Sequence, residues 1–340
     1  MRNLMLAAGL LLAGEACAGS SARVGTAGAN DAEALAPRRF TVMSWNTQHY
    51  GWDNKSKEKQ TLLEQNMFDV IRAVNPDVFL QQETYGSFER FKAALPEYRS
   101  VLQSECNSLF SKFPIVATNG VWADPMAPRP LPMNACTLAY AELDLGGMRV
   151  RVSSFAMFWL PLCIFVPTDL SSRDLLAWEA RSQAYPMTPR PQAIRMALAA
   201  LAPVLADCDV IPFVIGGDFN SFSHLDWTAA NGAAARHCGR AVPWAVSKAM
   251  FDAGFVDSWR AVHPDAVANN GVTAPMPGAV KDIPNPHARI DYLYSAGSRV
   301  KAVAAEIVAG PYHKPFIWRE RGYSAFPSDH AALVVTYEFR

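Results

Sequence analysis

The chain has 340 residues, of which 50% are apolar and 18% are charged, a composition typical of a globular protein with a full-size core. Its 31 basic side chains are balanced by 31 acidic ones, so the net charge provides no general attraction to nucleic acid. This balance counts mildly against a dedicated DNA-binding protein, although a local basic groove remains compatible with it.

Residues 1–18 have the pattern of a secretory signal peptide. Arg2 precedes an apolar run over 4–13, and small residues follow in Ala16-Cys17-Ala18. The run is too short to span a bilayer. We therefore expect a secreted protein, periplasmic or extracellular. A lipoprotein anchored through Cys17 is the alternative, which Glu15 in the cleavage region disfavours.

Beyond the signal, the chain divides into a linker and a folded domain. Residues 19–37 are rich in Ala, Gly and Ser and lack periodicity, which predicts a flexible linker. Residues 38–340 are expected to form one domain. Apolar segments predict its strands, and apolar residues at helical spacing predict its helices. In chain order we expect strands at 40–45, 78–82, 98–102, 115–122, 138–143, 148–155, 211–215, 289–294, 300–308 and 331–339, and helices at 57–74, 191–205 and 247–253.

The segment over 215–221, Ile-Gly-Gly-Asp-Phe-Asn-Ser, presents an acid and an amide at the end of a predicted strand. Because residues i and i+2 of a strand point to the same side, we expect Asp218 and Asn220 to reach one point in space. One acid beside one neutral amide suits the activation of water next to a charged oxygen. The segment by itself is equally compatible with a turn or a helix cap.

Polar residues recur at the ends of other predicted strands, at Asn46, Glu83, Asp291 and Asp329-His330. Each has an ordinary explanation as a turn, cap or surface residue, but the set has a chemical logic. Carboxylate and amide oxygens suit a hard cation such as Mg²⁺, which neutralises phosphate charge and lowers the pKa of bound water. A histidine oriented by an aspartate serves as a general base or charge stabiliser. The sequence has no clustered zinc-ligand histidines, no P-loop and no nucleophile-elbow serine.

The order of these motifs resembles the endonuclease/exonuclease/phosphatase superfamily over residues 39–340. The most specific segments are Gly217-Asp218-Phe219-Asn220-Ser221 and Ser328-Asp329-His330, supported by Ser44-Trp45-Asn46 and Gln82-Glu83. The resemblance implies an α/β fold, namely a four-layered α/β sandwich. In it, two mostly antiparallel mixed β-sheets pack face to face with helices outside. It also implies an active site at one edge of the sandwich.

The same resemblance implies a metal site. Glu83 corresponds to the principal metal ligand of the superfamily, Asn46 lies beside it, and Asp329 resembles a residue near the metal. The expected ion is Mg²⁺, with Mn²⁺ and Ca²⁺ as alternatives.

Four further residues take catalytic roles by resemblance. Asp218 corresponds to the aspartate that orients or deprotonates the attacking water, and Asn220 to the amide that holds a phosphate oxygen. His330 corresponds to the histidine bound to the phosphate, and Asp291 to the carboxylate that orients it. The expected activity is hydrolysis of a phosphodiester by metal-assisted water attack.

One position departs from the superfamily pattern. Many members carry a second histidine, or a tyrosine, at the end of the central strand, where this chain offers Phe155, Ala156 or Met157 depending on the register. None of the three can donate a proton. Metal-bound water, His224 or His313 could supply it. The alternative is a catalytically impaired binding protein on the same scaffold.

The substrate class stays open between nucleic acid and a phospholipid or another small phosphodiester. Apolar residues over 158–167 and an aromatic segment over 315–318, flanked by Lys314, Arg319 and Arg321, favour the second class and peripheral contact with a membrane. The many nucleases of the superfamily favour the first. A monomer is expected.

Overall fold

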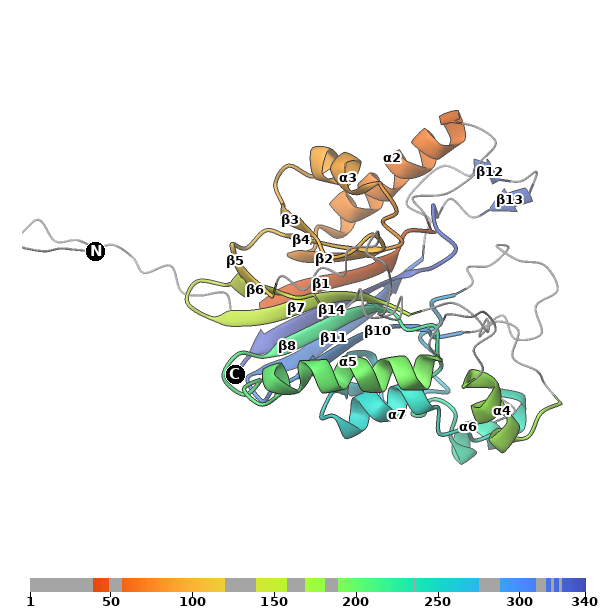
Figure 1. Cartoon of the computed structure of the whole chain (residues 1–340). Coiled ribbons are helices and arrows are strands. Elements are labelled where there is room, and N and C mark those ends of the chain that lie inside the picture. Colours follow the sequence, from red (N-terminus) through yellow and green to blue (C-terminus); the bar gives the residue numbers. More distant parts are fainter. Residues whose placement is uncertain are drawn as a thin grey trace, which may run out of the picture. The chain divides into compact units, whose positions relative to one another are not determined.

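Two six-stranded mixed sheets face each other, and helices lie on their outer sides (Figure 1). In spatial order the first sheet contains β11 (Val300–Val308), β14 (Ala332–Phe339), β1 (Arg39–Asn46), β2 (Val78–Gln82), β4 (Asn107–Ser111) and β3 (Arg99–Leu102). The second contains β5 (Ile115–Thr118), β6 (Ala141–Asp144), β7 (Arg149–Ala156), β8 (Phe213–Asp218), β10 (Asp291–Ala296) and β9 (Val256–Asp257). A separate two-stranded hairpin consists of β12 (Phe316–Trp318) and β13 (Arg321–Tyr323).

The computed structural model describes residues 39–48, 57–119, 139–157, 169–180, 189–234, 237–274, 288–309, 316–318, 321–323 and 326–340. These residues all belong to one compact unit, residues 36–340. The predicted signal peptide and linker, the apolar segment 158–167, His313 and Lys314 lie outside the described residues. Among the helices of the described part, none combines the length and the apolar character that a membrane crossing requires.

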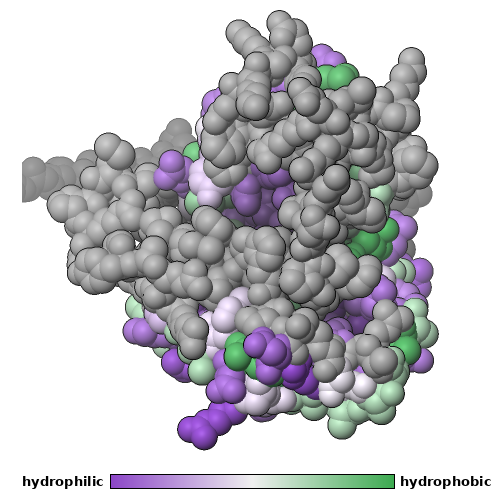
Figure 2. All heavy atoms as spheres, turned by 90° about the vertical axis from the view of Figure 1, so that its right-hand side faces the viewer, coloured by the Kyte–Doolittle hydropathy of each residue, from purple (hydrophilic) through white to green (hydrophobic). Residues whose placement is uncertain are grey.

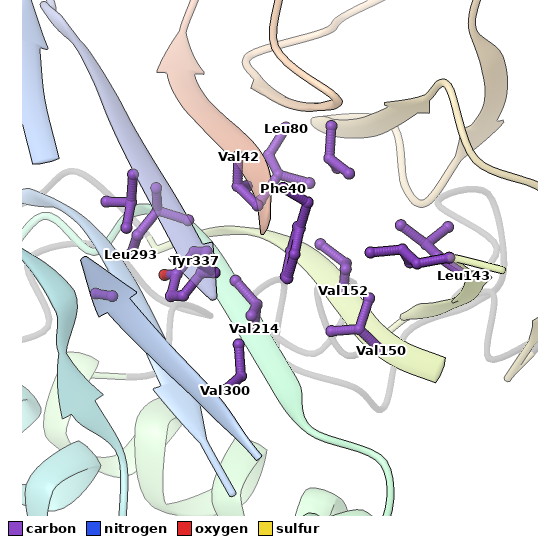
Figure 3. Packing of buried hydrophobic residues seen from close by; sticks show 14 of the residues in the cluster. Phe40, Val42, Leu80, Leu143, Val150, Val152, Val214, Leu293, Val300 and Tyr337 are labelled. Carbon is purple, nitrogen blue, oxygen red and sulfur yellow. The ribbon is translucent and has the colours of Figure 1, made fainter. Parts of the chain in front are cut away.

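The core between the sheets follows from the alternation of side chains along each strand. Val42 and Leu80 from the first sheet meet Val152, Val214 and Leu293 from the second (Figure 3). All five are completely buried. The residues between them point outwards and need a second cover, which the helices provide.

Two helices cover the first sheet. Helix α2 (Lys57–Val74) packs Met67 and Ile71 onto its outer face, and α3 (Phe88–Ala94) adds Phe91. Aromatic contacts of Phe91 with Phe79 and Phe110 join α3 to strands β2 and β4. The apolar stripe that predicted α2 is therefore the stripe that the sheet buries.

Helices α5 (Arg190–Leu205) and α7 (Ala245–Asp252) cover the second sheet. Ile194 and Leu201 of α5 and Met250 of α7 pack against Phe213 and Tyr294. Four shorter helical segments lie in the connections: α4 (Ser172–Glu179), α6 (Ala229–Ala233), the 3₁₀ helix η3 (His237–Gly239) and α8 (Ser258–Val262). The four-layered sandwich expected from the sequence is confirmed.

Several sequence predictions of individual elements were incomplete. Strand β4 and the short elements α4, α6, α8 and β9 were not predicted. The strand expected over 115–122 ends at Thr118 in the described part, and the strand expected from residue 211 begins at Phe213.

Candidate active site

The inward-facing residues at one edge of the sandwich form a row across both sheets. Gly216 shows which residues of β8 face inwards, because a Cβ on it would meet Leu293, Leu80 and Ser44 between the sheets. The inward residues two positions nearer the edge are therefore mostly polar. They are Asn46, Gln82 and Asn107 in the first sheet, and Ala156, Asp218 and Asp291 in the second.

The direction of the strands brings three more residues to this edge. Strands β2 and β8 end here, so Glu83 and Asn220 follow them, and His330 lies two residues before β14, which begins here. Strand β14 runs towards the C-terminus, marked at the left of Figure 1, so the edge lies at the right. Figure 2 faces that side and shows hydrophilic residues in a hollow near its middle.

Asn46 joins two acidic side chains. Its Nδ2 donates to Glu83 Oε1 and to Asp218 Oδ2, each at 3.1 Å, and its Oδ1 accepts from the backbone N–H of Gln48 at 2.9 Å. Asn46 is 1% exposed, while Glu83 is half-buried. Glu83 has a φ of 58°, a left-handed conformation that turns the chain away from the direction of β2.

Asp218 and Asn220 meet, but not through strand alternation as the sequence predicted. Strand β8 ends at Asp218, and Asn220 has a φ of 48°, so the two residues form a tight turn. The backbone N–H of Asn220 donates to Asp218 Oδ1, and its Nδ2 donates to Asp218 Oδ2, both at 2.8 Å. A second bond from Asn220 Nδ2 reaches the carbonyl of Met157 at 3.1 Å. The prediction of the contact holds, and the predicted geometry was wrong because an Asx-type turn replaces the strand.

His330 lies between the two buried aspartates. Its Nδ1 is 2.9 Å from Asp291 Oδ2, and its Nε2 is 4.0 Å from Asp218 Oδ2. Burial acts to lower the pKa of His330, but the charge and hydrogen bond of Asp291, together with the charges of Asp218 and Asp329, outweigh burial and raise that pKa well above its ordinary value. This shift favours the imidazolium form, and the Asp291 carboxylate accepts the hydrogen bond from Nδ1–H.

The pKa of Asp218 is raised as well, which for a carboxyl group favours the neutral form. Burial, with the neighbouring charge of Asp291, raises the pKa of Asp218 to about 7, and the positive charge of His330 counteracts this only in part. Asp291 is the direct cross-strand partner of Asp218 and is 0% exposed. An acid with a pKa near neutrality can exchange a proton under working conditions.

The backbone of His330 is held by residues of two sequence motifs, Ser44-Trp45-Asn46 and Ser328-Asp329-His330. Trp45 Nε1 donates to the His330 carbonyl at 2.9 Å. Ser328 Oγ accepts from the His330 N–H at 3.1 Å and donates to the Asn46 carbonyl at 2.7 Å. The sequence pointed to these motifs without assigning a role to Trp45 or Ser328.

The donor set fits a hard divalent cation. Glu83 offers a carboxylate directly beside the Asn46 amide, and oxygen ligands of this kind are those that Mg²⁺ and Ca²⁺ take. Asp329 is half-buried and contacts Gln48, the residue whose backbone N–H binds Asn46 Oδ1. Its backbone N–H donates to Gln48 Oε1 at 3.2 Å, and its charge helps to raise the pKa of His330. Its role beside a metal stays a prediction.

The register of β7 against β8 shows which of Phe155, Ala156 and Met157 lies beside Asp218. Ala156 is the neighbour of Asp218 on the parallel strand β7, and it continues the inward row of Val152 and Ser154. Phe155 points to the outer layer, where its ring packs 4.8 Å from that of Phe219. A methyl group therefore stands beside Asp218.

The candidate donor His224 is engaged elsewhere. Its Nδ1 lies 2.9 Å from Ser247 Oγ, and its ring packs against Phe251, both on α7. Burial lowers its pKa. Within the described part of the chain, His224 makes no hydrogen bond to the residues of the row.

Residues 43–330 match the model of the Endonuclease/Exonuclease/phosphatase family. The chain belongs to this family. Among proteins, a segment of 136 residues is 31% identical to an uncharacterized protein of Caenorhabditis elegans, and it covers 38% of this chain. The chain spans about two fifths of the length of that relative (41%).

Solved structures share the endonuclease/exonuclease/phosphatase fold at low identity. A Bacteroides thetaiotaomicron protein of the same family is 14% identical, with a TM-score of 0.55 over 89% of this chain and 98% of that chain. TDP2 from C. elegans is 18% identical, with a TM-score of 0.53 over 88% of this chain and 74% of that chain. TDP2 of D. rerio, in complex with a single-strand DNA product, is 12% identical, with a TM-score of 0.54 over 89% of this chain and 100% of that chain. At these identities the likeness concerns the fold alone.

Proposed function

We propose that this protein is a divalent-metal-dependent phosphoesterase that hydrolyses a phosphodiester by direct attack of water. The observation that carries the proposal is the convergence of three pairs at one edge of the sandwich. These pairs are Asn46–Glu83, Asp218–Asn220 and Asp291–His330. Membership of the endonuclease/exonuclease/phosphatase family supports it.

Glu83 and Asn46 would hold the metal, with Asp329 close by. A bound divalent cation neutralises phosphate charge and lowers the pKa of water. The carboxylate of Glu83 supplies the negative charge that such an ion requires, and the bond from Asn46 Nδ2 fixes its orientation.

Asp218 is the group placed to take the proton of the attacking water. Three N–H donors, two from Asn220 and one from Asn46, hold its carboxylate in a single orientation. A pKa of about 7 lets the carboxylate accept a proton and release it again near neutral pH. Both hydrogens of the Asn220 amide are engaged with Asp218 Oδ2 and the Met157 carbonyl. Asn220 therefore orients Asp218, and the predicted contact with a phosphate oxygen would require these bonds to exchange.

His330 is the group placed to stabilise charge on the phosphoryl oxygens. Its Nδ1–H is occupied by Asp291, which leaves Nε2–H directed towards the Asp218 side of the site. A fixed, buried imidazolium stabilises charge that develops on an oxygen, and the loss of one such donor costs about 100-fold or more in rate.

Nucleic acid is the substrate class to test first. TDP2 of D. rerio shares the fold and was solved with a single-strand DNA product, which supports a DNA phosphodiester here. The segments that favoured a phospholipid lie mostly outside the described residues. Secretion remains part of the proposal, supported by the pattern of residues 1–18.

Hydrolysis of bis-(p-nitrophenyl) phosphate with Mg²⁺, with and without EDTA, tests the proposal. We expect EDTA and the changes Glu83→Ala and His330→Ala each to lower the rate by about 100-fold or more. His263→Ala is the matched control, because that ring binds the Ala305 carbonyl at 2.9 Å, outside the row. Equal rates for wild type and His330→Ala, or a rate indifferent to EDTA, would favour the binding-protein alternative that the methyl group of Ala156 suggests.

A comparison of natural substrates separates the two classes. Cleavage of a single-stranded DNA oligonucleotide is measured beside release of phosphocholine from sphingomyelin vesicles, at equal enzyme and Mg²⁺ concentrations. We expect the oligonucleotide to be cleaved faster. Faster release from vesicles would replace the nuclease assignment with a phospholipase one.

A further inference from the structure

Thr273 joins the two chain segments that carry the catalytic pair, although no sequence motif pointed to it. It is 0% exposed and lies in the connection that precedes β10. Its hydroxyl oxygen accepts from the backbone N–H groups of Ile290 at 3.2 Å and Asp291 at 3.1 Å. Its carbonyl accepts from the N–H of Ala331, the residue after His330, at 2.7 Å.

The Thr273 hydroxyl is needed as an acceptor because the edge strand of the second sheet, β9, is too short to pair with the start of β10. Strand β9 has two residues, which pair only with Tyr294 and Ser295 of β10. The first residues of β10 therefore have no strand neighbour on that side within the described part of the chain. A buried backbone N–H without an acceptor is costly, and the Thr273 hydroxyl takes the place of the missing strand carbonyl.

The two members of the pair are held in different ways. The backbone of His330 has separate partners in Trp45 and Ser328. For the backbone N–H of Asp291, the Thr273 hydroxyl is the hydrogen-bond acceptor found among the described residues. Loss of that hydroxyl would thus act mainly on Asp291, and through it on the imidazole that Asp291 holds.

We propose that Thr273 is a positioning residue for the His330–Asp291 pair. The inference rests on the proposed function, since it assigns Thr273 to the same reaction. Thr273 touches no reacting atom. It sets where β10 begins, and so the 2.9 Å separation of Asp291 Oδ2 from His330 Nδ1. A displacement of about 1 Å at a catalytic group can cost about 100-fold in rate, so a contact of this kind has a measurable effect.

Thr273→Val and Thr273→Ser form a matched pair. Valine keeps the shape and removes the acceptor, while serine keeps the hydroxyl. We expect Thr273→Val to lower kcat by about 10- to 100-fold with KM within about threefold of wild type, and Thr273→Ser to retain kcat within about threefold. If Thr273→Val does not fold, Thr273→Cys, which is similar in size and only a weak acceptor, replaces it. A kcat of wild-type size in the Val variant would overturn the proposal.

A double-mutant cycle separates positioning from a general structural effect. If Thr273 acts through His330, then Thr273→Val added to His330→Ala lowers kcat by less than about threefold further, because the two effects are not additive. A general loss of packing would instead multiply the two effects, and that result would overturn the proposal.

A measurement without substrate distinguishes failure of this inference from failure of the proposed function. Nuclear magnetic resonance of the His330 imidazole and hydrogen exchange of the Asp291 amide require no activity. We expect Thr273→Val to shift the imidazole resonances and speed exchange at Asp291, with Thr273→Ser close to wild type. If Thr273→Val shows these changes and the wild-type protein has no activity, the phosphoesterase assignment is wrong and the positioning role stands. Unchanged spectra in the Val variant would overturn the positioning role.

Discussion

The buried carboxylate of Asp218 in the candidate site is unfavourable for the stability of the fold. It is 3% exposed and faces another buried carboxylate, Asp291, directly across the strand pair. Two like charges at this spacing disfavour ionisation, and burial adds to the effect. Asn46, Asn220 and His330 compensate in part. A residue selected for folding alone would be neutral here, so the carboxylate is best explained by chemistry.

Replacement of Asp218 by asparagine should therefore separate activity from stability. We expect Asp218→Asn to raise Tm by about 2–4 °C in the presence of EDTA, because a buried like-charge contact is removed. Hydrolysis of bis-(p-nitrophenyl) phosphate should fall by about 100-fold or more, since the general base is lost. The control is Asp69→Asn, on the exposed side of α2 beside Arg72. A lower Tm together with retained activity would contradict this assignment.

Strand β8 requires a glycine at position 217, where it pairs with Phe155 of β7. A Cβ on Gly217 would lie 1.6 Å from the carbonyl oxygen of Phe155, a backbone atom that cannot rotate away. At Gly216 the nearest atoms, at 2.6 and 2.8 Å, are side-chain methyl groups of Leu293 and Leu80. The glycine pair before Asp218 is thus required by close approach of backbone and side chains.

We expect the two alanine substitutions to differ in severity. Gly217→Ala should destabilise the fold by about 3 kcal/mol or more, because β7 and β8 must separate. Gly216→Ala should cost less, since leucine side chains can adopt other rotamers. Urea unfolding followed by circular dichroism gives both values. An equal loss of stability in the two variants would show that the Phe155 carbonyl yields more easily than its position in the sheet implies.

The elements that the sequence predicted well are those with a strong period. Helix α2 and strand β11 have the predicted bounds, because their apolar residues follow the helical repeat or alternate with more exposed ones, and β2 has them because a continuous apolar run follows Asn75-Pro76. Strand β4 was missed because Asn-Ser-Leu-Phe-Ser is buried on both faces and carries no alternation. The short helices α6 and α8 are set by capping contacts of Thr228 and Asp257, a signal too local to stand out in the sequence.

The site residues were predictable as motifs, but the residues that surround them and hold them in place were not. Asn46 and Asp218 are the last residues of strands with recognisable ends, and His330 precedes such a strand. The choice of Ala156 over its neighbours needed the register of β7 against β8, which no local pattern encodes. Thr273 acts on a residue 18 positions away in the chain, through a hydroxyl that sequence inspection treats as ordinary.

At the scale of the whole folded unit, the site exists only when distant parts of the chain have come together. Strands β1 and β14 are neighbours in one sheet although they lie near opposite ends of the folded part. Trp45 and His330 are 285 residues apart in sequence and share a hydrogen bond. Contacts this far apart in sequence carry a loop-closure cost, and the site needs strands of both sheets, so activity should report on the integrity of both sheets.

A buried charge cluster ties the same region together behind the site. Asp226, in the connection after β8, binds Arg289 Nε at 2.8 Å and Arg260 Nε at 2.6 Å, and Arg289 Nη1 lies 2.8 Å from Asp257. Burial acts to raise the pKa of Asp226, but the two arginines outweigh it and lower that pKa below its ordinary value. The cluster thus links the connection after β8 to Arg289, which lies two residues before β10.

This cluster predicts a specific form of acid lability. A depressed folded-state pKa stabilises the protein above the unfolded value of about 4, and the contribution disappears as pH falls through the folded-state pKa. We expect Asp226→Asn to lose on the order of 3 kcal/mol at pH 7, because it leaves two buried arginines short of a counter-charge. The difference from wild type should shrink as pH falls below 4. Thermal melts between pH 3 and pH 7, with Asp252→Asn as the control for an exposed pair with Lys248, measure it. If the difference stays constant across that range, Asp226 contributes to stability through packing and not through its charge.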